Sequence, residues 1–290
     1  MRPVPKWTGA RGSDAMNEIA ERESGIESFR KTLASPVIFV PTMGALHDGH
    51  AALISKARQI SASVVVSVFI NPLQFDSSSD LEKYPVSHEA DRKIAELAGA
   101  KFIWIPSYDE VYPGEIQKIS AGPLGKIFEG DSRDGHFDGV LTVVKRLFDS
   151  VRPDKAIFGE KDFQQLFLIK KMIKELNLKV EVISHPTVRD EDGLALSSRN
   201  TRLTSEGRMA AKVIYQALAK ASTSTKPRLT LHQTLMSEPL LKIDYAEVID
   251  ERDFTIVEDG DENPHRRLIV AGWIDDVRLI DNMKIAGRPS

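Results

Sequence analysis

The stretch from Val37 to His50 constrains the fold of this chain more than any other part of the sequence. It opens with four apolar residues, Val37–Val40, which are typical of a strand buried on both faces. We expect this strand to end at Pro41, because proline has no N–H to donate to a sheet ladder. Gly44 then allows a sharp turn, and helical periodicity follows to about Ile60. The pattern predicts a central parallel strand, a turn and a helix.

Two histidines, His47 and His50, stand three residues apart in the first turn of that helix and therefore share one face. A helix start offers unpaired N–H groups and the positive end of the helix dipole, and both favour a phosphate. Imidazoles placed there can donate to phosphate oxygens that gain charge in a transition state. A single histidine in this position is more commonly a helix cap, and a zinc site would need a third ligand, which no recognisable spacing supplies. We interpret the pair as part of a phosphate-binding turn.

Strands and helices alternate along the first two thirds of the chain. Besides the elements above, the pattern predicts strands at 63–70, 102–105, 156–158 and 179–183, and helices at 19–33, 88–97, 140–151 and 163–176. Gly99 is a typical stop for the helix 88–97. This alternation predicts an α/β fold: a Rossmann-like, doubly wound parallel sheet with right-handed crossovers.

The pattern changes after about residue 204. Helices at 206–221 and 229–241 precede strands at 243–249, 268–273 and 277–280. We therefore predict two domains. Residues 1–185 form the Rossmann-like domain, with residues 1–18 as a flexible lead-in, and residues 186–290 form a smaller C-terminal α+β domain.

Composition argues against several classes of function. The 39 Lys and Arg residues against 42 Asp and Glu residues give a net charge of −3, which gives no support to a nucleic-acid partner. Without cysteine, the chain has no disulfide, thiolate nucleophile or cysteine-based zinc site. No apolar run reaches the roughly 18–20 residues of a membrane span, and the first residues lack the apolar stretch of a signal peptide. We therefore expect a cytoplasmic protein that binds neither nucleic acid nor membrane.

The turn after the first strand resembles the HIGH-type signature of the adenylyl-transferring Rossmann enzymes. The longer string from Pro41 to His50 is similar to that of the pantoate–β-alanine ligase family, and the similarity spans about Val37 to Asn282. The resemblance implies that His50 is the proton donor, and that His47 and Lys161 are further catalytic residues. It also implies that one continuous turn binds ATP through Met43, Gly44, Ala45, Leu46, His47, Asp48, Gly49 and His50.

Two segments that follow strands resemble substrate-binding segments of the same family. Gln74 lies in Asn71-Pro72-Leu73-Gln74-Phe75, and the resemblance implies that it contacts pantoate and β-alanine. Its amide can donate to a carboxylate or hydroxyl and can accept from an amine. Tyr84 is a weaker candidate for the entrance of the amine. The segment from Gly159 to Gln165 implies a pantoate contact at Gln165 and ATP contacts at Gly159, Glu160, Lys161 and Asp162.

Leu196-Ser197-Ser198-Arg199 resembles the KMSKS-like loop of these enzymes. Two hydroxyls and a guanidinium can bind a triphosphate and neutralise the departing pyrophosphate. The resemblance implies ATP contacts at Val188, Leu196, Ser197, Ser198 and Arg199, with Gly193 as a hinge for loop closure.

The chain departs from the family pattern at two positions. Leu196 stands where family members commonly have methionine, a nearly volume-conserving exchange. Asp134 replaces the common proline in Ser132–Phe137, and there Arg133 is a candidate for phosphate or subunit contacts.

The resemblance implies a ligation in two steps. The pantoate carboxylate attacks the α-phosphorus of ATP, giving pantoyl adenylate and pyrophosphate, and the amine of β-alanine then displaces AMP. Mg²⁺ is implied as a cofactor, and Asp154 or Asp162 could hold it through water. We expect a homodimer, a C-terminal domain that acts as a lid, and one cleft for ATP lined by the histidine turn and the Ser-Ser-Arg loop.

Two other functions share part of this pattern. An enzyme that leaves the nucleotide on its product would share the histidine turn but has no reason to carry Gln74 and Gln165. A protein that only binds nucleotide has no reason to carry every polar group the ligation needs. Release of AMP that requires both pantoate and β-alanine would distinguish the ligase from both.

Overall fold

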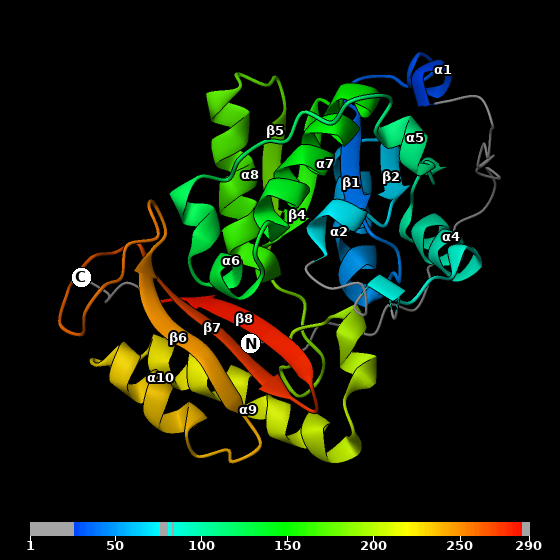
Figure 1. Ribbon diagram of the computed structural model, residues 1–290. Coiled ribbons are helices and arrows are strands. Elements are labelled where there is room, and N and C mark those ends of the chain that lie inside the picture. The colour runs from blue at the N-terminus through cyan, green and yellow to red at the C-terminus, as the bar shows by residue number, and fades with distance from the viewer. Residues whose placement is uncertain (1–25, 76–80, 83, 286–290) are drawn as a thin grey trace. The chain divides into compact units, whose positions relative to one another are not determined.

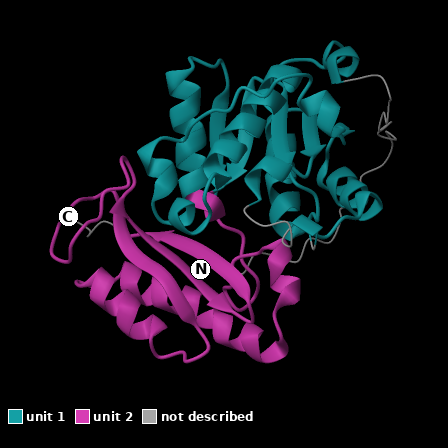
Figure 2. Cartoon of the chain, viewed as in Figure 1, with its two compact units in different colours: residues 1–159, 164–186 teal, residues 160–163, 187–290 magenta. Residues whose placement is uncertain are grey.

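The computed structural model describes residues 26–75, 81–82 and 84–285, and the chain divides into two units (Figure 2). The first comprises residues 1–159 and 164–186, and the second comprises residues 160–163 and 187–290. Residues 160–163 group with the second unit although they precede residue 186 in the chain. The predicted lead-in, residues 1–18, lies outside the described residues. That the second unit acts as a lid stays a prediction.

A five-stranded parallel sheet is the centre of the first unit (Figure 1). Its strands, in the spatial order β3-β2-β1-β4-β5, are β1 (Ile38–Thr42), β2 (Val64–Val68), β3 (Phe102–Trp104), β4 (Lys155–Gly159) and β5 (Glu181–His185). The helices are α1 (Ile26–Arg30), α2 (Asp48–Ile60), α4 (His88–Ala98), α5 (Tyr108–Val111), α6 (Glu129–Ser132), α7 (His136–Val151) and α8 (Phe163–Glu175). Short 3-10 turns are η1 (Pro72–Gln74) and η2 (Pro123–Lys126). The predicted doubly wound parallel sheet is confirmed.

The first strand runs one residue past the predicted end at Pro41. Pairing of β1 with β2 continues to Thr42, whose carbonyl accepts the N–H of Phe69 at 3.0 Å. Because alternate residues of a parallel strand bond to opposite neighbours, Pro41 faces β4. On that side the ladder has partners only at Ile38 and Phe39, so the missing N–H of Pro41 removes no bond. The prediction was wrong because it ignored which neighbour the proline faces.

Alternating residues of β1 build a core on each face of the sheet. Ile38 and Val40 belong to a buried cluster with residues of α2 and α4. Phe39 points to the other face, where its ring meets that of Phe148 on α7 edge-on at 6.3 Å between centroids. Burial on both faces explains why this strand is a continuous apolar run.

Helix boundaries follow local backbone chemistry. Gly99 ends α4 as predicted, with φ +102° and its N–H directed at the carbonyls of Ala95 and Glu96. The helix predicted at 140–151 begins four residues earlier, at His136, directly after Gly135 with φ +73°. The first turn, residues 136–139, is buried at His136 and Phe137, but it follows a Gly-rich stretch and is too short to show helical periodicity in the sequence.

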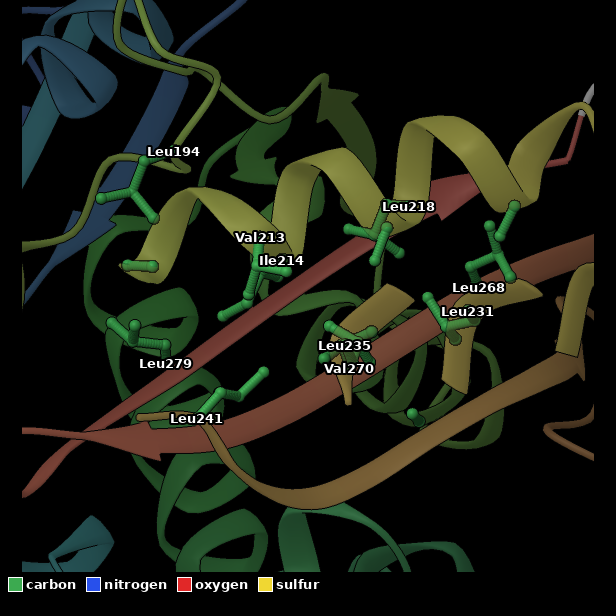
Figure 3. Close-up of a cluster of buried hydrophobic side chains, with 14 of the residues drawn as sticks. Leu194, Val213, Ile214, Leu218, Leu231, Leu235, Leu241, Leu268, Val270 and Leu279 are labelled. Carbon is green, nitrogen blue, oxygen red and sulfur yellow. The ribbon is translucent and has the colours of Figure 1, made fainter. Parts of the chain in front are cut away.

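The second unit contains a three-stranded antiparallel sheet, in the order β6-β7-β8, with two helices on one face. Its elements are η3 (Glu160–Asp162), η4 (Ser198–Arg202), α9 (Ser205–Ser222), α10 (Pro227–Leu235), β6 (Lys242–Asp250), β7 (Arg266–Ile274) and β8 (Val277–Lys284). Leu218 of α9 and Leu231 of α10 share one buried cluster with Leu268 of β7 and Leu279 of β8 (Figure 3). The predicted α+β domain is confirmed, although α10 ends at Leu235 and not at residue 241.

None of the helices in the part of the chain that the structure describes combines the length and the hydropathy needed to cross a membrane.

Candidate functional site

The order of the parallel strands reverses between β1 and β4, and the two histidines follow β1 at this point. In open parallel sheets, ligands bind beyond the carboxyl ends of the strands where the order reverses. His47 is the N-cap of α2, and His50 is the third residue of that helix. Their ring centroids lie 4.2 Å apart. The structure therefore brings the predicted catalytic pair together where a parallel sheet binds its ligands.

Both imidazoles accept a backbone N–H through Nδ1. Nδ1 of His47 accepts from the backbone of Gly49 at 3.1 Å, and Nδ1 of His50 accepts from the backbone of His47 at 3.3 Å. An accepting ring nitrogen carries no proton, so the neutral rings carry their proton on Nε2. This reciprocal pair is a capping box that begins α2. The same two side chains therefore begin the helix and have an Nε2–H as their donor.

Asp91 of α4 holds the turn that precedes the histidines. Its carboxylate, which is 2 % exposed, accepts the N–H of Leu46 at 2.7 Å and that of Ala45 at 3.2 Å. A Cβ added at Gly44, where φ is +84°, would lie 2.9 Å from Oδ2 of Asp91 and 3.0 Å from Val68. Both the φ and this crowding explain why glycine stands at position 44.

Gln74 lies beside the end of β1. Its Nε2 donates to Sδ of Met43 at 2.6 Å, and its Oε1 accepts from Nδ2 of Asn71 at 3.1 Å. Gln74 is buried, as is Asn71, the residue that caps η1. Two residues predicted to contact different substrates, Met43 and Gln74, are therefore in contact.

The backbone carbonyl of Gln74 is bonded to the start of α7. Nδ1 of His136 lies 2.7 Å from this oxygen, and Nη2 of Arg133 donates to it at 3.3 Å. A carbonyl only accepts, so the proton of His136 is on Nδ1 and its Nε2 accepts from Nη1 of Arg133 at 3.1 Å. Arg133, a candidate for phosphate or subunit contacts, therefore bonds to His136 and Gln74 of its own chain.

The two adjacent glutamines at the start of α8 differ in their partners. Gln164 is buried, and its amide donates to the carbonyls of Leu124 and Ile127 and accepts the N–H of Glu129. Gln165 is half-buried, and its side chain has no partner within the described residues. Of the two, only Gln165 has an amide that a substrate could engage without breaking the fold.

Strands β7 and β8 hold the turn that carries Lys161. Nδ2 of Asn282 donates to the carbonyls of Glu160 at 2.8 Å and of Lys161 at 2.9 Å. Arg267 reaches the Glu160 carboxylate at 3.4 Å, and its guanidinium lies 3.9 Å from the ring centroid of Phe163. These contacts explain why residues 160–163 group with the second unit.

The Ser-Ser-Arg loop begins η4 in the same unit. Oγ of Ser197 accepts the N–H of Arg199 at 3.3 Å, and the N–H of Leu196 donates to the carbonyl of Val188 at 2.9 Å. Both η3 and η4 contact β8. Three predicted ATP contacts, Val188, Leu196 and Ser197, are therefore brought together.

A buried ion pair supports this loop. Arg189 donates to Oδ1 of Asp281 on β8 at 2.9 Å and to the carbonyl of Gly193 at 3.0 Å. Burial raises the pKa of Asp281, and the hydrogen bonds from Arg189 oppose that rise. Gly193 has φ +90°, and a Cβ there would overlap the ring of Tyr215. Packing and backbone conformation thus account for this glycine, and its role as a hinge stays a prediction.

Asp154 and Asp162 are the two carboxylates expected to hold the implied Mg²⁺. Among the described residues, no group of three or more His, Cys, Asp or Glu side chains is arranged to hold a metal. Asp154 accepts the N–H of Val37 at 2.6 Å and so lies at the amino edge of the sheet, opposite the histidines. Asp162 lies 3.6 Å from Nζ of Lys161. Magnesium in nucleotide enzymes uses one or two carboxylates plus phosphate oxygens, which Asp162 fits and Asp154 does not.

Comparison with known proteins decides the family. The profile described as "Pantoate-beta-alanine ligase" matches residues 14–284. The chain belongs to the pantoate–β-alanine ligase family. It is similar to the pantothenate synthetase of Acidothermus cellulolyticus, with 42% identity over 285 residues that cover 95% of this chain and 94% of the relative.

Two solved structures of pantoate–β-alanine ligases extend the comparison. The crystal structure of pantothenate synthetase from Thermus thermophilus has a TM-score of 0.85 and 41% identity, covering 91% of this chain and 98% of that one. The pantoate–β-alanine ligase from Francisella tularensis, described as complexed with beta-gamma ATP and β-alanine, has a TM-score of 0.74 and 35% identity, covering 90% and 95%. The chain therefore has the fold of this family of ligases and is an enzyme of that class.

Three residues of this pantoate–β-alanine ligase that support the site were missed by sequence analysis as functional residues. Asn71 stands within the Asn-Pro-x-Gln-Phe string and could have been found there. Asp91 and Asn282 carry no local signal, because their partners are 45 and 122 residues away in the chain. Tyr84 is buried with its ring edge-on to that of Phe75 at 5.7 Å, and its contact with β-alanine stays a prediction.

Proposed function

We propose that this chain condenses pantoate with β-alanine at the expense of ATP, through a pantoyl adenylate, and releases AMP and pyrophosphate. The family membership supports the reaction as a whole. One observation supports assigning the catalytic role to His47 and His50. Their rings lie together where the order of the parallel strands reverses, which is where this fold binds ligands.

In the first step, an oxygen of the pantoate carboxylate forms a bond to the α-phosphorus of ATP. The bond from that phosphorus to the bridging oxygen breaks, and pyrophosphate leaves with the electron pair. Nε2–H of His47 and of His50 donate to phosphate oxygens, as do the hydroxyls of Ser197 and Ser198. Lys161 and Arg199 neutralise charge on the triphosphate. Positioning and charge stabilisation of this kind require no covalent bond to the protein.

In the second step, the neutral amine of β-alanine attacks the acyl carbon of the adenylate. A C–N bond forms, the C–O bond to the phosphate breaks, and AMP leaves while the amine loses a proton to solvent. Gln74 and Gln165 orient pantoate in both steps. Since water would hydrolyse the adenylate, we assign the second unit the function of covering the bound intermediate.

We propose that ATP is bound as its magnesium complex, with Asp162 as the carboxylate nearest the ion. Mg²⁺ would neutralise charge on the phosphates. We also propose a homodimer in the cytoplasm. The absence of cysteine, which suits a reducing compartment, supports the location, and light scattering of the purified chain would test the dimer.

The test of the function is release of AMP with each substrate left out in turn. We expect AMP only when ATP, pantoate and β-alanine are all present, and exchange of labelled pyrophosphate into ATP when pantoate is present without β-alanine. A product that retains the nucleotide would support a nucleotidyltransferase instead. Tight ATP binding without turnover would overturn the proposed ligation.

A further inference from the structure

The orientation of the Gln74 amide decides which chemical group of a substrate it can bind. A glutamine amide has an oxygen that only accepts and an NH₂ group that only donates, and the two are similar in shape. The surrounding hydrogen bonds therefore determine which end faces the ligand. Around Gln74, these bonds lead back to backbone groups whose roles are fixed.

Asn71 is the first fixed point. Its side chain is 0 % exposed, and its Oδ1 accepts the backbone N–H of Leu73 at 3.3 Å, a group that can only donate. Its Nδ2 donates to the carbonyl of Gly139 at 3.1 Å, a group that can only accept. If the amide were flipped, its NH₂ group would face the N–H of Leu73 and its oxygen would face the carbonyl of Gly139. Each of these two contacts therefore fixes the orientation of Asn71 on its own.

Gln74 takes its orientation from Asn71. The same Nδ2 donates to Oε1 of Gln74 at 3.1 Å, so Nε2 of Gln74 is directed to the other side, toward Met43 at 2.6 Å. The close approach of α7 is essential to this arrangement, because a Cβ at Gly139 would overlap the backbone of Leu73 and Gln74. Gln74 thus has N–H groups on the side of the ATP-binding turn.

Tyr112 completes the arrangement from the end of α5. Its hydroxyl donates to Oδ1 of Asn71 at 2.8 Å, and its side chain is 3 % exposed. The ring lies edge-on to Phe69 and tilted against Tyr108, which fixes the direction of the hydroxyl. Burial raises the pKa of Tyr112, so the hydroxyl keeps its proton at neutral and alkaline pH.

We propose that Tyr112 and Asn71 are positioning residues that hold the Gln74 amide with its NH₂ group toward the substrate. This orientation makes Gln74 selective for a carboxylate or hydroxyl oxygen. This inference rests on the proposed function and makes it more specific. Pantoate or β-alanine binds Gln74 through a carboxylate or hydroxyl oxygen, and the amine of β-alanine does not bind Gln74.

The first test is Tyr112→Phe, with Tyr108→Phe as the matched control. Tyr108 is 43 % exposed and loses the same hydroxyl from the same helix. Removing one hydrogen bond from the arrangement should raise the KM for pantoate about fivefold in Tyr112→Phe. The KM for ATP should stay within about twofold, because the Tyr112 hydroxyl bonds to Asn71 and is connected to the ATP-binding turn indirectly, through Gln74 and its contact with Met43. Tyr108→Phe should resemble the parent chain.

A double-mutant cycle separates positioning from general stability. In a Gln74→Ala background there is no amide to orient, so Tyr112→Phe should not weaken pantoate binding further, as measured by calorimetry with a non-hydrolysable ATP analogue. Asn71→Asp should weaken pantoate binding more than Tyr112→Phe does, because a carboxylate cannot donate to Oε1 and the amide would turn its oxygen toward the substrate.

The outcomes separate this inference from the function on which it rests. An active parent chain with an unchanged pantoate KM in Tyr112→Phe would overturn the inference alone. Equal rises in the KM for pantoate and ATP, or a Tyr112→Phe effect that persists without Gln74, would also overturn it. A parent chain that does not turn over pantoate and β-alanine would overturn both.

Discussion

At the scale of single residues, the histidine pair combines a structural and a chemical role in each side chain. Nδ1 of each ring caps a backbone N–H, and this fixes the proton of the neutral ring on Nε2. A substitution that removes the whole imidazole therefore removes both roles. Glutamine at position 50 separates them, because Glu or Gln at this position of a capping box accepts the same backbone N–H.

We predict that His50→Ala and His50→Gln both lose activity but differ in stability. Loss of one transition-state donor should lower the rate of pyrophosphate exchange by about 10²–10³-fold in either variant. Loss of the cap should cost His50→Ala about 1 kcal/mol of unfolding free energy, whereas His50→Gln should retain most of it. Exchange assays and urea unfolding of the two variants measure these effects. A normal exchange rate in His50→Gln would show that the imidazole is not needed.

Asp250 provides a prediction about acid stability. Its buried carboxylate accepts from Arg252 and from Nδ2 of Asn263, and the hydrogen bond from the Arg252 side chain holds its pKa well below the usual range. Because the folded-state pKa is below the unfolded value of about 3.9, this carboxylate stabilises the fold above about pH 4. The stabilisation is lost as the pH falls through the lower, folded-state pKa.

Asp250→Asn should therefore be less stable than the parent near pH 7, and the difference should shrink as the pH falls below about 4. Urea unfolding across this range measures it. Asp276→Asn, which changes an exposed carboxylate in the turn between β7 and β8, is the control and should follow the parent at every pH. A constant difference between Asp250→Asn and the parent would rule out a contribution from ionisation.

At the scale of elements, the second unit holds a turn that lies far from it in the sequence. Asn282 of β8 donates to two carbonyls of η3, and Arg267 of β7 stacks on Phe163 directly after that turn. The backbone position of Lys161 is therefore set by strands about a hundred residues further along the chain. Asn282, for which no ATP contact is predicted, can in this way control the lysine predicted to bind ATP.

We predict that Asn282→Asp raises the KM for ATP about tenfold and leaves the KM for pantoate nearly unchanged. The carboxylate loses two donated hydrogen bonds and faces two carbonyl oxygens, and one or two hydrogen bonds correspond to about that factor. Steady-state kinetics with each substrate varied measures both constants. Asn177→Asp, an exposed change in the first unit, should have no effect. Equal rises in both constants would indicate general damage to the fold.

These contacts also show what the sequence could predict. Apolar periodicity located every strand of both sheets and the helices that cover them. It could do so because a buried face of a strand or helix produces a regular spacing of apolar residues within a short stretch of sequence. The family resemblance then located the histidine turn and Gln74. The sequence did not reveal the roles of Asp91 and Asn282. Both side chains bond to backbone N–H or carbonyl groups, which every residue type provides apart from the N–H that proline lacks, and these groups lie far away in the sequence. The extension of β1 past Pro41 was missed for a related reason: only the register shows which neighbour the proline faces.

At the scale of the whole molecule, the predicted ATP contacts are divided between the two units. Met43–His50 and Gly159 belong to the first unit, while Glu160–Asp162, Val188 and Leu196–Arg199 belong to the second. Neither set alone provides both the imidazoles and the Ser-Ser-Arg group. If one ATP molecule uses both sets, substitutions in either unit must weaken the same binding event.

We predict that His47→Ala and Arg199→Ala each weaken binding of a non-hydrolysable ATP analogue about tenfold or more, because each removes a donor to the phosphates. Calorimetry on the whole chain measures the affinity. Arg202→Ala is the matched control, since it removes a second arginine from the same turn, one for which no ATP contact is predicted. ATP affinity that depends on His47 but not on Arg199 would confine nucleotide binding to the first unit. The Ser-Ser-Arg loop would then need another explanation, because its guanidinium would be serving neither the phosphates nor the departing pyrophosphate.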